Sequence, residues 1–460
     1  MRTIKTFDHA DYDASWPMHK RDSARAIIFV DDKLLMVRSA KYGEYKFPGG
    51  GIEPGESHRA ALIREVCEET GHTLIPNSII EYGKTLIRSK SNNANEIFEQ
   101  ESFYYFCDVA PHATAAPTPD AGYEQEFGYA PIWVTPAEAI AANQQRTNLP
   151  QIPWVQRELA VLGELQAIMQ LKMQLSIAFP ALPIRTLSPL ADGKAGTTFA
   201  VNDDLVLKIS LGTDDSDSCL AMEYDVLSAL RGKMDFPIPQ PFFFAQLPDG
   251  RYALIESRVP GVPFSQEVYE TFTQPEKDAI FIQLGSVTHQ LHNVSTPHFS
   301  QISVYDPAAN LADFHKYYTQ DIKNVLTPTE QARIEQIAGD FQAAAASCPI
   351  PTVLCHGDLH FGNLNYDPQT KRLCGLFDFG LVCYNDPLNE FRYFWSDTVT
   401  IILHAYPGDL GDNIAARHLF YCMCNIIEEA HGELRAGPPG FFVDTLKRVI
   451  FQKPIQNIYT

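Results

Sequence analysis

The sequence predicts a chain of two domains, each of mixed α and β structure. At 460 residues the chain exceeds the usual length of a single domain. Two groups of glycine and acidic residues, at 50–71 and 356–378, lie on either side of a helical pattern at 154–175. We therefore expect a first domain at 1–171, which ends in a connecting helix, and a second domain at 172–460.

The composition is that of an ordinary globular protein, because 45% hydrophobic and 11% aromatic residues suffice for full cores. The formal net charge of −20 argues against nonspecific binding to nucleic acid or to an anionic membrane. Small phosphorylated ligands remain compatible with this charge, since they need only local cations or a metal ion. The expected partners are nucleotides and small-molecule substrates, and the oligomeric state stays open.

Cysteine usage and the first residues indicate a reducing cytoplasm. The N-terminal segment lacks the apolar core of a signal peptide, and no apolar run approaches the roughly 18 residues of a membrane span. The nine cysteines are odd in number and scattered, unlike a secreted disulfide framework. His418, Cys422 and Cys424 admit a metal site or buried helix packing, and the helical pattern favours packing.

The strands and helices expected in the first domain surround one glycine-rich segment. Residues 57–70 contain no Gly or Pro, which predicts a helix that Ser57 can cap. The glycines at 49–51, with Pro54 and Gly55, predict a tight loop before this helix. Other patterns predict a β-hairpin at 23–37 with its turn at Asp31 and Asp32, strands at 103–109 and 130–135, and a short helix at 136–142.

The glutamates of the predicted helix suggest a metal site. Glu65, Glu68 and Glu69 stand three and four residues apart, which brings their carboxylates to one helix face. Such charges repel one another unless a cation lies among them, and oxygen ligands favour Mg²⁺ or Mn²⁺. Arg64, four residues before Glu68, can orient it by an ion pair. The alternative is an acidic helix face that is simply solvated.

The whole frame of this segment resembles the Nudix box. Its fixed positions are Gly50, Glu56, Arg64, Glu65, Glu68, Glu69 and Gly71. The resemblance implies an α/β/α sandwich that hydrolyses nucleoside diphosphates linked to another group. It implies that Glu65, Glu68 and Glu69 bind the metal with help from Glu56, and that Glu68 and Glu69 take part in catalysis. Glu126 is the candidate general base, with Glu124 as the alternative, and His72 departs from the aliphatic residue usual in the family.

The second domain opens with strand and glycine patterns suited to phosphate binding. Lys208 lies in the strand-like LVLKI, and Glu223, fifteen residues later, lies in a helical pattern from which it can pair with Lys208. Gly193 and Gly196 predict a hairpin turn over phosphates. A strand at 252–264 then leads into a hinge, where the backbone around Glu256 and Ser257 can meet an adenine edge.

Two later motifs suggest phosphoryl transfer. The chain reads HGDLHFGN from His356, and LFDFG delivers Asp378 fifteen residues after Asn363. Asp358 can accept the proton of an attacking hydroxyl, while Asn363 and Asp378 can hold Mg²⁺ on nucleotide phosphates.

These motifs resemble the aminoglycoside phosphotransferase and choline kinase group. The resemblance implies a two-lobed, protein-kinase-like fold with an N-lobe at about 178–258 and a C-lobe at about 259–460. It implies that Asp358 is the catalytic base, that Asn363 and Asp378 bind Mg²⁺, and that Lys208 and Glu223 position the phosphates. His356 is expected to brace the loop, His360 has either a structural or a catalytic role, and Asp386 steadies the loop.

The chain as a whole is therefore expected to be a bifunctional hydrolase and kinase. The glycine loop ADGKAGTT lacks a full G-x-G-x-x-G, which leaves ATP and GTP open as phosphate donors. The helices from Asp397 onward are expected to form the acceptor pocket for a small hydroxylated molecule of the aminoglycoside, choline or amino alcohol type. Neither substrate is fixed by the sequence. The alternative is that one domain only senses nucleotides and regulates the other.

Overall fold

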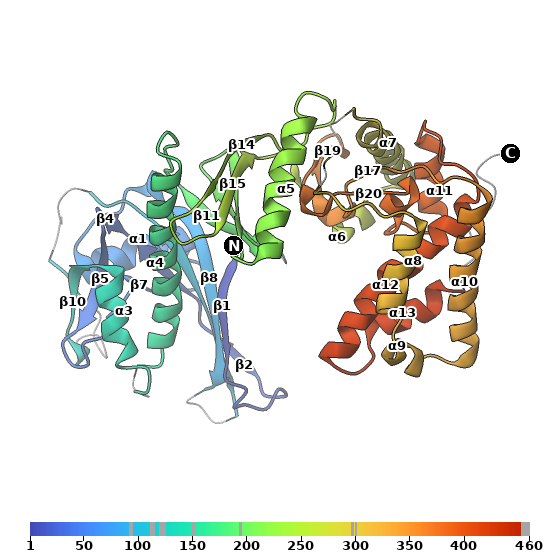
Figure 1. The fold of residues 1–460 in the computed structure, drawn as a ribbon. Helices are drawn as coiled ribbons and strands as arrows, with labels where there is room; N and C mark the ends of the chain where they lie inside the picture. Colours follow the sequence, from blue (N-terminus) through green and yellow to red (C-terminus); the bar gives the residue numbers. More distant parts are fainter. Residues whose placement is uncertain are drawn as a thin grey trace. The chain divides into compact units, whose positions relative to one another are not determined.

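The computed structural model describes residues 1–91, 95–110, 116–118, 126–149, 152–192, 196–295, 299 and 301–451, without the side chains of 191–192 and 396–397. The described chain divides into two compact units, unit 1 at Met1–Leu175 and unit 2 at Ser176–Thr460. Both combine helices and strands, so the predicted fold class of two mixed α and β domains is confirmed (Figure 1).

Unit 1 is built on two sheets. Among the described residues, the larger sheet has the order β1-β8-β9-β3-β7 with β2 beside β9, and the smaller has the order β10-β5-β4 with β6 beside β5. The strands are β1 (Thr3–Asp8), β2 (Met18–Lys20), β3 (Ser23–Ile27), β4 (Phe29–Val30), β5 (Lys33–Ser39), β6 (Tyr45–Lys46), β7 (Gly49–Gly51), β8 (Ile80–Lys90), β9 (Ile97–Phe106) and β10 (Tyr129–Val134).

Helix α1 (His58–Thr70) packs against β3, β7 and β10. Its apolar side chains Ala61, Leu62 and Val66 join one core cluster with residues of β3 and β5. Helices α3 (Pro136–Gln144) and α4 (Val155–Ala178) follow, and the predicted boundary between 171 and 172 falls inside α4.

Three local predictions for unit 1 need correction. The predicted hairpin is shorter, because β4 pairs with β5 around Asp31, whereas β3 pairs with β7 and β9 in the other sheet. The glycines 49–51 form strand β7 rather than a loop. Strand β9 begins earlier than predicted and ends at Phe106, after which Val109 makes only an isolated bridge to Leu74.

Unit 2 begins with an antiparallel sheet of the order β11-β12-β13-β15-β14. Its strands are β11 (Leu187–Asp192), β12 (Gly196–Val201), β13 (Leu205–Ser210), β14 (Pro241–Gln246) and β15 (Tyr252–Ser257). Helix α5 (Asp214–Leu230) packs against β13, β14 and β15. Its first turn is held by a capping box between Thr213 and Ser216.

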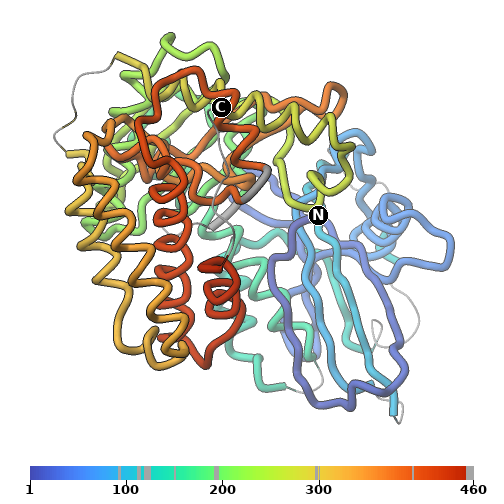
Figure 2. Tube along the Cα trace, turned by 90° about the vertical axis from the view of Figure 1, so that its right-hand side faces the viewer, coloured from blue at the N-terminus to red at the C-terminus, as the bar shows by residue number. Residues whose placement is uncertain are grey.

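The rest of unit 2 is mainly helical. Helices α10 (Pro328–Ser347) and α12 (Ile414–Ala436) run side by side, and the rings of Phe341 and Phe420 stack between them with centroids 3.9 Å apart (Figure 2). The other helices are α6 (Gln266–Glu270), α7 (Gln274–His292), α8 (Pro307–Tyr317), α9 (Gln320–Asn324), α11 (Ser396–Ala405) and α13 (Phe441–Val449).

Short strands and 3₁₀ turns carry the predicted motifs of this part. The strands are β16 (Val262–Pro263), β17 (Val353–Cys355), β18 (Leu364–Asp367), β19 (Arg372–Leu376) and β20 (Cys383–Asn385). The 3₁₀ turns of unit 2 include η2 (Phe361–Asn363), η3 (Phe379–Leu381) and η4 (Pro387–Phe391), whereas η1 (Pro76–Ser78) lies in unit 1.

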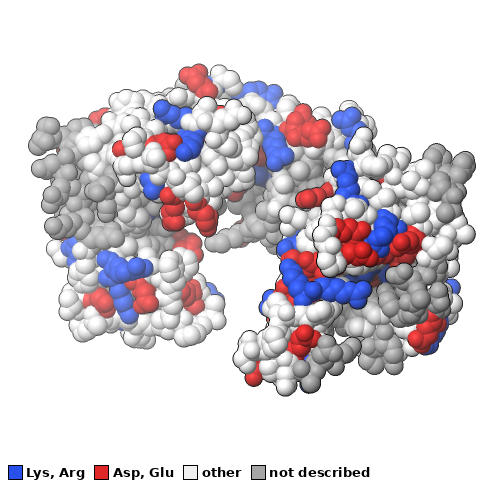
Figure 3. All heavy atoms as spheres, turned by 180° about the vertical axis from the view of Figure 1, so that it is seen from behind, with Lys and Arg blue, Asp and Glu red and all other residues white. Residues whose placement is uncertain are grey.

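Both signs of charge occur on one face of the molecule. On the face drawn in Figure 3, Lys and Arg side chains lie among Asp and Glu side chains, and neither sign covers that face. Within the described ranges, no helix combines the length and the apolar character that crossing a membrane requires.

Candidate functional sites

The glutamates of unit 1 are positioned by a helix with defined ends. The Ser57 side chain accepts a hydrogen bond from the Ala60 N–H at the start of α1, as predicted. At the other end Gly71 adopts a left-handed conformation with φ of 72°, which glycine tolerates without strain.

Arg64 forms hydrogen bonds with three of the predicted glutamates. Its guanidinium donates to Glu56 at 2.9 Å, to Glu65 at 2.8 Å and to Glu68 at 3.3 Å. A further bond at 3.1 Å reaches the carbonyl of Gly51 at the end of β7. Hydrogen bonds from Arg64 lower the pKa of Glu56, and bonds to the glutamates, first of all to Glu56, raise the pKa of Arg64. Arg64 therefore links the three carboxylates to the glycine strand.

Glu69 lies apart from that exposed cluster, in the interior. Its carboxylate accepts hydrogen bonds from Lys46 Nζ at 2.7 Å and from the Gly49 N–H at 2.8 Å. Both charged side chains are 3% exposed. The sequence analysis did not predict the role of Lys46, because Lys46 lies in strand β6, 23 residues before Glu69 of helix α1, and only the tertiary fold brings the two together.

The residues present fit a divalent cation beside β7. A Cβ atom at Gly50 would lie 2.4–2.5 Å from the carboxylate of Glu65, so only glycine lets the carboxylate approach the backbone this closely. The adjacent carboxylates of Glu56, Glu65 and Glu68 supply the oxygen ligands that Mg²⁺ or Mn²⁺ prefers. The set of donors is thus suited to a hard cation that also binds phosphate oxygens.

The remaining positions of the first site lie outside the cluster. Glu126 is exposed and forms an ion pair with Lys41, and Glu124 lies outside the described residues. His72 packs edge-on against Trp133 with ring centroids 6.1 Å apart. His72 therefore has a packing role at a position where the family usually has an aliphatic residue.

In unit 2, Lys208 of β13 lies among three carboxylates. Its Nζ is 2.5 Å from Glu223, 3.0 Å from Asp378 and 3.9 Å from Glu256. Burial opposes the charge of Lys208, but these carboxylates outweigh it and raise the pKa of Lys208. Glu223 also accepts a hydrogen bond from the Phe379 N–H at 2.9 Å. The predicted Lys208–Glu223 pair is therefore formed, and it is connected to the segment that holds Asp378.

Glu256 is the unusual member of this group. Its side chain is 3% exposed, and its Oε2 has no hydrogen-bond partner among the described residues. Burial raises the pKa of Glu256 to about 8 despite the nearby ammonium. The group therefore contains one carboxyl that readily holds a proton.

Three side chains surround the carboxylate of Asp358. Tyr393 Oη donates to its Oδ1 at 2.9 Å, Asn363 Nδ2 donates to its Oδ2 at 3.0 Å, and His360 Nε2 lies 3.4 Å from Oδ2. His360 Nδ1 accepts from the Gly362 N–H, so its proton resides on Nε2, which faces Asp358. Burial alone would raise the pKa of Asp358, but His360 and Tyr393 hold it well below its usual range.

The backbone around Asp358 and Asp378 is held in uncommon conformations. Asp378 has φ of 69° and Gly357 has φ of 80°. A Cβ atom at Gly357 would lie 1.9 Å from the carbonyl oxygen of Leu381, which requires glycine there. His356 joins the two loops, because its Nδ1 accepts from the Asp358 N–H and its Nε2 donates to the Phe377 carbonyl at 3.0 Å. The bracing role expected for His356 agrees with these contacts.

Part of the backbone that was predicted to bind the nucleotide base already forms hydrogen bonds within the protein. The Ser257 N–H donates to the carbonyl of Gln240, and the Gln240 N–H donates to Ser257 Oγ, both at 2.9 Å. A Cβ atom at Gly196 would lie 2.1 Å from the Ile209 carbonyl, so this glycine is required by strand pairing. Gly193 lies outside the described residues.

The sequence analysis did not predict the role of Glu390, which braces the loop that contains Asp358. Buried Glu390 accepts hydrogen bonds from the His356 N–H at 2.6 Å and the Gly357 N–H at 3.3 Å. His292 lies 3.4 Å from the same carboxylate. The sequence offered one signal, an acidic residue four positions after Asp386. Asp386 itself forms a buried ion pair with Arg417 at 2.5 Å, consistent with the expected steadying role.

The cysteines of α12 belong to the core. His418 and Cys422 are buried, and His418 Nε2 lies 3.1 Å from the carbonyl oxygen of Phe391. Burial lowers the pKa of His418 to about 4. These contacts agree with packing rather than metal binding.

Comparison with known proteins identifies unit 1. Residues 19–156 match the family model described as NUDIX domain. A MutT-like protein of Streptomyces ambofaciens is 38% identical over 55 residues, which cover 12% of this chain and 36% of that protein. The CTP pyrophosphohydrolase of Escherichia coli (strain K12) is 29% identical over 129 residues, which cover 27% of this chain and 83% of that protein. The chain thus spans about a third of the length of the MutT-like protein.

Comparison of structures identifies the fold of unit 2. The GDP complex of a mutant aminoglycoside 2'-phosphotransferase-IIIa is similar with a TM-score of 0.53 and 17% identity, covering 61% of this chain and 95% of that one. The GDP complex of the wild-type enzyme gives a TM-score of 0.51 and 18% identity, with 61% and 96% covered. Residues 186–419, about half of the chain, match the model described as Phosphotransferase enzyme family. The chain therefore belongs to the phosphotransferase enzyme family and also carries a NUDIX domain.

Proposed function

We propose that the chain is bifunctional. Unit 1 hydrolyses a nucleoside diphosphate-linked compound with Mg²⁺ or Mn²⁺, and unit 2 transfers a phosphoryl group from ATP or GTP to a hydroxyl of a small molecule. The observation that carries the proposal is the constellation in unit 2, where Asp358 is ionised and oriented while Lys208 joins Glu223 to Asp378. The named ligands of similar structures, GDP and kanamycin, support a nucleotide donor and a hydroxylated acceptor.

In unit 2 the acceptor hydroxyl would give its proton to the Asp358 carboxylate as its oxygen bonds to the terminal phosphorus. The bond from that phosphorus to the bridging oxygen would break, and the nucleoside diphosphate would leave. Tyr393 and His360 orient that carboxylate toward the acceptor. Lys208 stabilises the negative charge of the phosphate oxygens, and Glu223 keeps its ammonium in place. Mg²⁺, held by Asn363 and Asp378, would supply further neutralisation of phosphate charge.

In unit 1 the diphosphate would lie beside β7, close to Glu65 and the glycine backbone. Arg64 fixes the carboxylates of Glu56, Glu65 and Glu68, so their geometry is set before the substrate arrives. A metal ion there would supply Lewis acidity and an activated water. Glu126 is proposed as the base, and its ion pair with Lys41 must open for it to reach the site.

The test for unit 2 is turnover with labelled ATP and GTP against a panel of aminoglycosides, choline and amino alcohols. The wild-type chain should release nucleoside diphosphate and label an acceptor. The variant Asp358→Asn should bind nucleotide and lose transfer by about 10²-fold or more. Nucleotide binding without any product from the wild-type chain would instead favour the alternative in which this unit is a sensor.

A further inference from the structure

Unit 2 contains a buried group of three side chains behind the loop that carries Asp358. His292 is the last residue of α7, Cys355 ends β17, and Glu390 lies in η4. A ring nitrogen of the first, the thiol sulfur of the second and a carboxylate oxygen of the third all lie within 4.8 Å of one another. The phosphoryl transfer proposed for unit 2 uses none of the three directly.

The carboxylate of Glu390 needs a cation beside it. Burial alone would raise the pKa of Glu390, but hydrogen bonds and charge from His292, together with His356, lower it. Among the described residues, His292 is the one basic side chain that forms an ion pair with this carboxylate, and both side chains are 0% exposed. An ionised carboxylate in the interior is costly without a partner. That partner is either a proton on His292 or a metal ion.

The spacing of the donor atoms favours a metal ion. His292 Nε2 lies 3.4 Å from Glu390 Oε2, whereas a hydrogen bond between charged groups spans about 2.7–2.9 Å. Two ligands about 2.1 Å from a tetrahedral Zn²⁺ ion lie about 3.4 Å apart, and a thiolate would lie about 3.6 Å from the nitrogen. The sulfur of Cys355 therefore needs to move by about 1 Å at most. Its contacts are long, 3.9 Å to the carbonyl oxygen of Asn385 and 3.7 Å to that of Asp386.

Tyr406 orients the imidazole of His292 for such an ion. The Tyr406 Oη lies 2.9 Å from Nδ1 of His292. When Nδ1 donates its proton to this hydroxyl, Nε2 presents a lone pair toward Glu390 and Cys355. Histidine ligands of metal ions usually have a hydrogen-bond partner of this kind on the other ring nitrogen.

We propose that His292, Cys355 and Glu390 bind one Zn²⁺ ion. Zn²⁺ accepts nitrogen, sulfur and oxygen donors together, whereas Mg²⁺ prefers oxygen alone. On binding, the S–H bond of Cys355 breaks, a Zn–S bond forms and one proton is released. The thiolate and the carboxylate then balance the charge of the ion, so the buried site is neutral. Since Glu390 also accepts hydrogen bonds from the His356 and Gly357 N–H groups, the ion would fix the start of the Asp358 loop.

The test measures the zinc bound by the full chain after refolding in excess Mg²⁺, with either Zn²⁺ or a chelator present. Refolding is needed because a buried site fills as the chain folds, and Mg²⁺ occupies the oxygen sites. The wild type should retain one zinc ion per chain and have a higher Tm with zinc than with the chelator. Cys355→Ser and His292→Gln should lose both the ion and this rise in Tm. Tyr406→Phe should weaken zinc affinity about tenfold.

Two measurements separate the loss of a ligand from the loss of the fold. Cys355→Ser changes one atom, so its Tm in the chelator should equal that of the wild type. Refolding with Co²⁺ should give a thiolate charge-transfer band that Cys355→Ser removes. Cys383→Ser is the matched control, because Cys383 lies opposite Cys355 in the β17–β20 pair but is not one of the three residues, and it should keep the band.

The inference fails if the refolded wild type binds no zinc, or if Cys355→Ser binds zinc as the wild type does. A charge-transfer band lost in Cys383→Ser but kept in Cys355→Ser would also overturn it. A proton on His292 would then be the partner of Glu390. None of these results depends on hydrolysis or phosphoryl transfer, so the proposed function is tested separately.

Discussion

At the scale of single residues, the surroundings of Asp358 keep its carboxylate ionised and fix its orientation. Three side chains contact its carboxylate, and only two of them, His360 and Asn363, lie in the motif that contains it. Tyr393 comes from a turn 35 residues later. Hydrogen bonds to a carboxylate favour its charged form, so loss of Tyr393 affects both the orientation and the basicity of Asp358.

Tyr393→Phe is expected to lower kcat for phosphoryl transfer by about tenfold, the effect of one hydrogen bond to a charged group. The pKa of Asp358 should rise, which moves the acidic limb of the pH–rate profile toward neutral pH. The matched control is Tyr12→Phe, which removes a tyrosine bond to Asp8 on the exposed surface of unit 1. A Tyr393 variant with an unchanged profile and rate would show that this bond does not support the base.

Glu256 predicts a pH dependence of stability. Its folded pKa of about 8 lies above the ordinary value of 4.5, because burial disfavours the charged form. The folded state therefore holds a proton that the unfolded state releases, and the contribution to stability present below pH 4.5 is lost as pH rises toward 8.

Glu256→Gln cannot ionise and should therefore gain thermal stability relative to the wild type between pH 5 and pH 9. The measurement is Tm against pH for both proteins. A constant difference in Tm across that range would contradict the raised pKa.

At the scale of elements, strand β7 and helix α1 pack against each other. The three glycines of β7 permit strand pairing with β3 and close approach of Glu65, whereas the sequence analysis predicted a tight loop. Glycine patterns mark places where backbone comes close to something, but they do not tell a strand from a turn. The helix itself was predictable because its cap, length and lack of breakers are local properties.

Gly50→Ala is expected to displace Glu65, since the new Cβ would lie 2.4–2.5 Å from its carboxylate, and to reduce hydrolysis by unit 1 strongly. Phosphoryl transfer should remain. Gly163→Ala, at an exposed position of helix α4 with open space around it, should instead stabilise the chain by up to about 1 kcal/mol. Equal hydrolysis by the Gly50 variant and the wild type would show that the approach of Glu65 to β7 is not needed.

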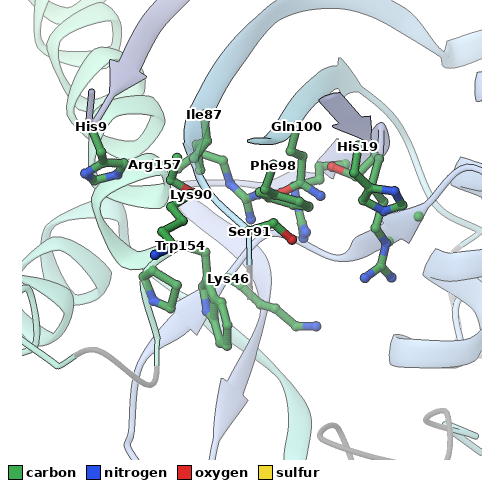
Figure 4. Close-up of a pocket in the computed structure, with 17 residues that line it drawn as sticks. His9, His19, Lys46, Ile87, Lys90, Ser91, Phe98, Gln100, Trp154 and Arg157 are labelled. Atoms are coloured by element: carbon green, nitrogen blue, oxygen red, sulfur yellow. The ribbon is translucent and has the colours of Figure 1, made fainter. Parts of the chain in front are cut away.

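The contacts that the sequence could not predict are those made between elements distant along the chain. The Lys46–Glu69 pair and the Glu390 brace both depend on which strands and loops become neighbours. Motif spacing, in contrast, predicted Lys208, Glu223, Asn363 and Asp378 as site residues, because each of them lies in a locally recognisable element. The sequence analysis did not predict the cavity of about 540 Å³ in unit 1 (Figure 4), which is lined in part by Lys and Arg side chains, because its lining residues come from β2, β3, β6, β7, β8, β9 and α4.

At the scale of the whole molecule, two compact units carry two unrelated sets of site residues. Unit 1 has a glutamate cluster, and unit 2 has an aspartate base and a lysine with its carboxylate partners. If each set serves its own reaction, a substitution in one set leaves the other activity intact.

The choice of variants follows from the geometry. Glu69→Gln is a poor choice, because it breaks the buried ion pair with Lys46, which costs about 3–5 kcal/mol of stability. The Glu68 side chain is partly exposed at 35%, and among the described residues it bonds only to Arg64, so Glu68→Gln should leave the fold intact.

The most direct test measures both activities of the full chain in one set of proteins, the wild type, Glu68→Gln and Asp358→Asn, after equal Tm values confirm folding. Hydrolysis is followed by release of monophosphate or pyrophosphate, and phosphoryl transfer by labelled acceptor. The account predicts that Glu68→Gln loses only hydrolysis and Asp358→Asn only transfer. Loss of both activities in either folded variant, or of neither activity in both, would contradict two independent catalytic sites.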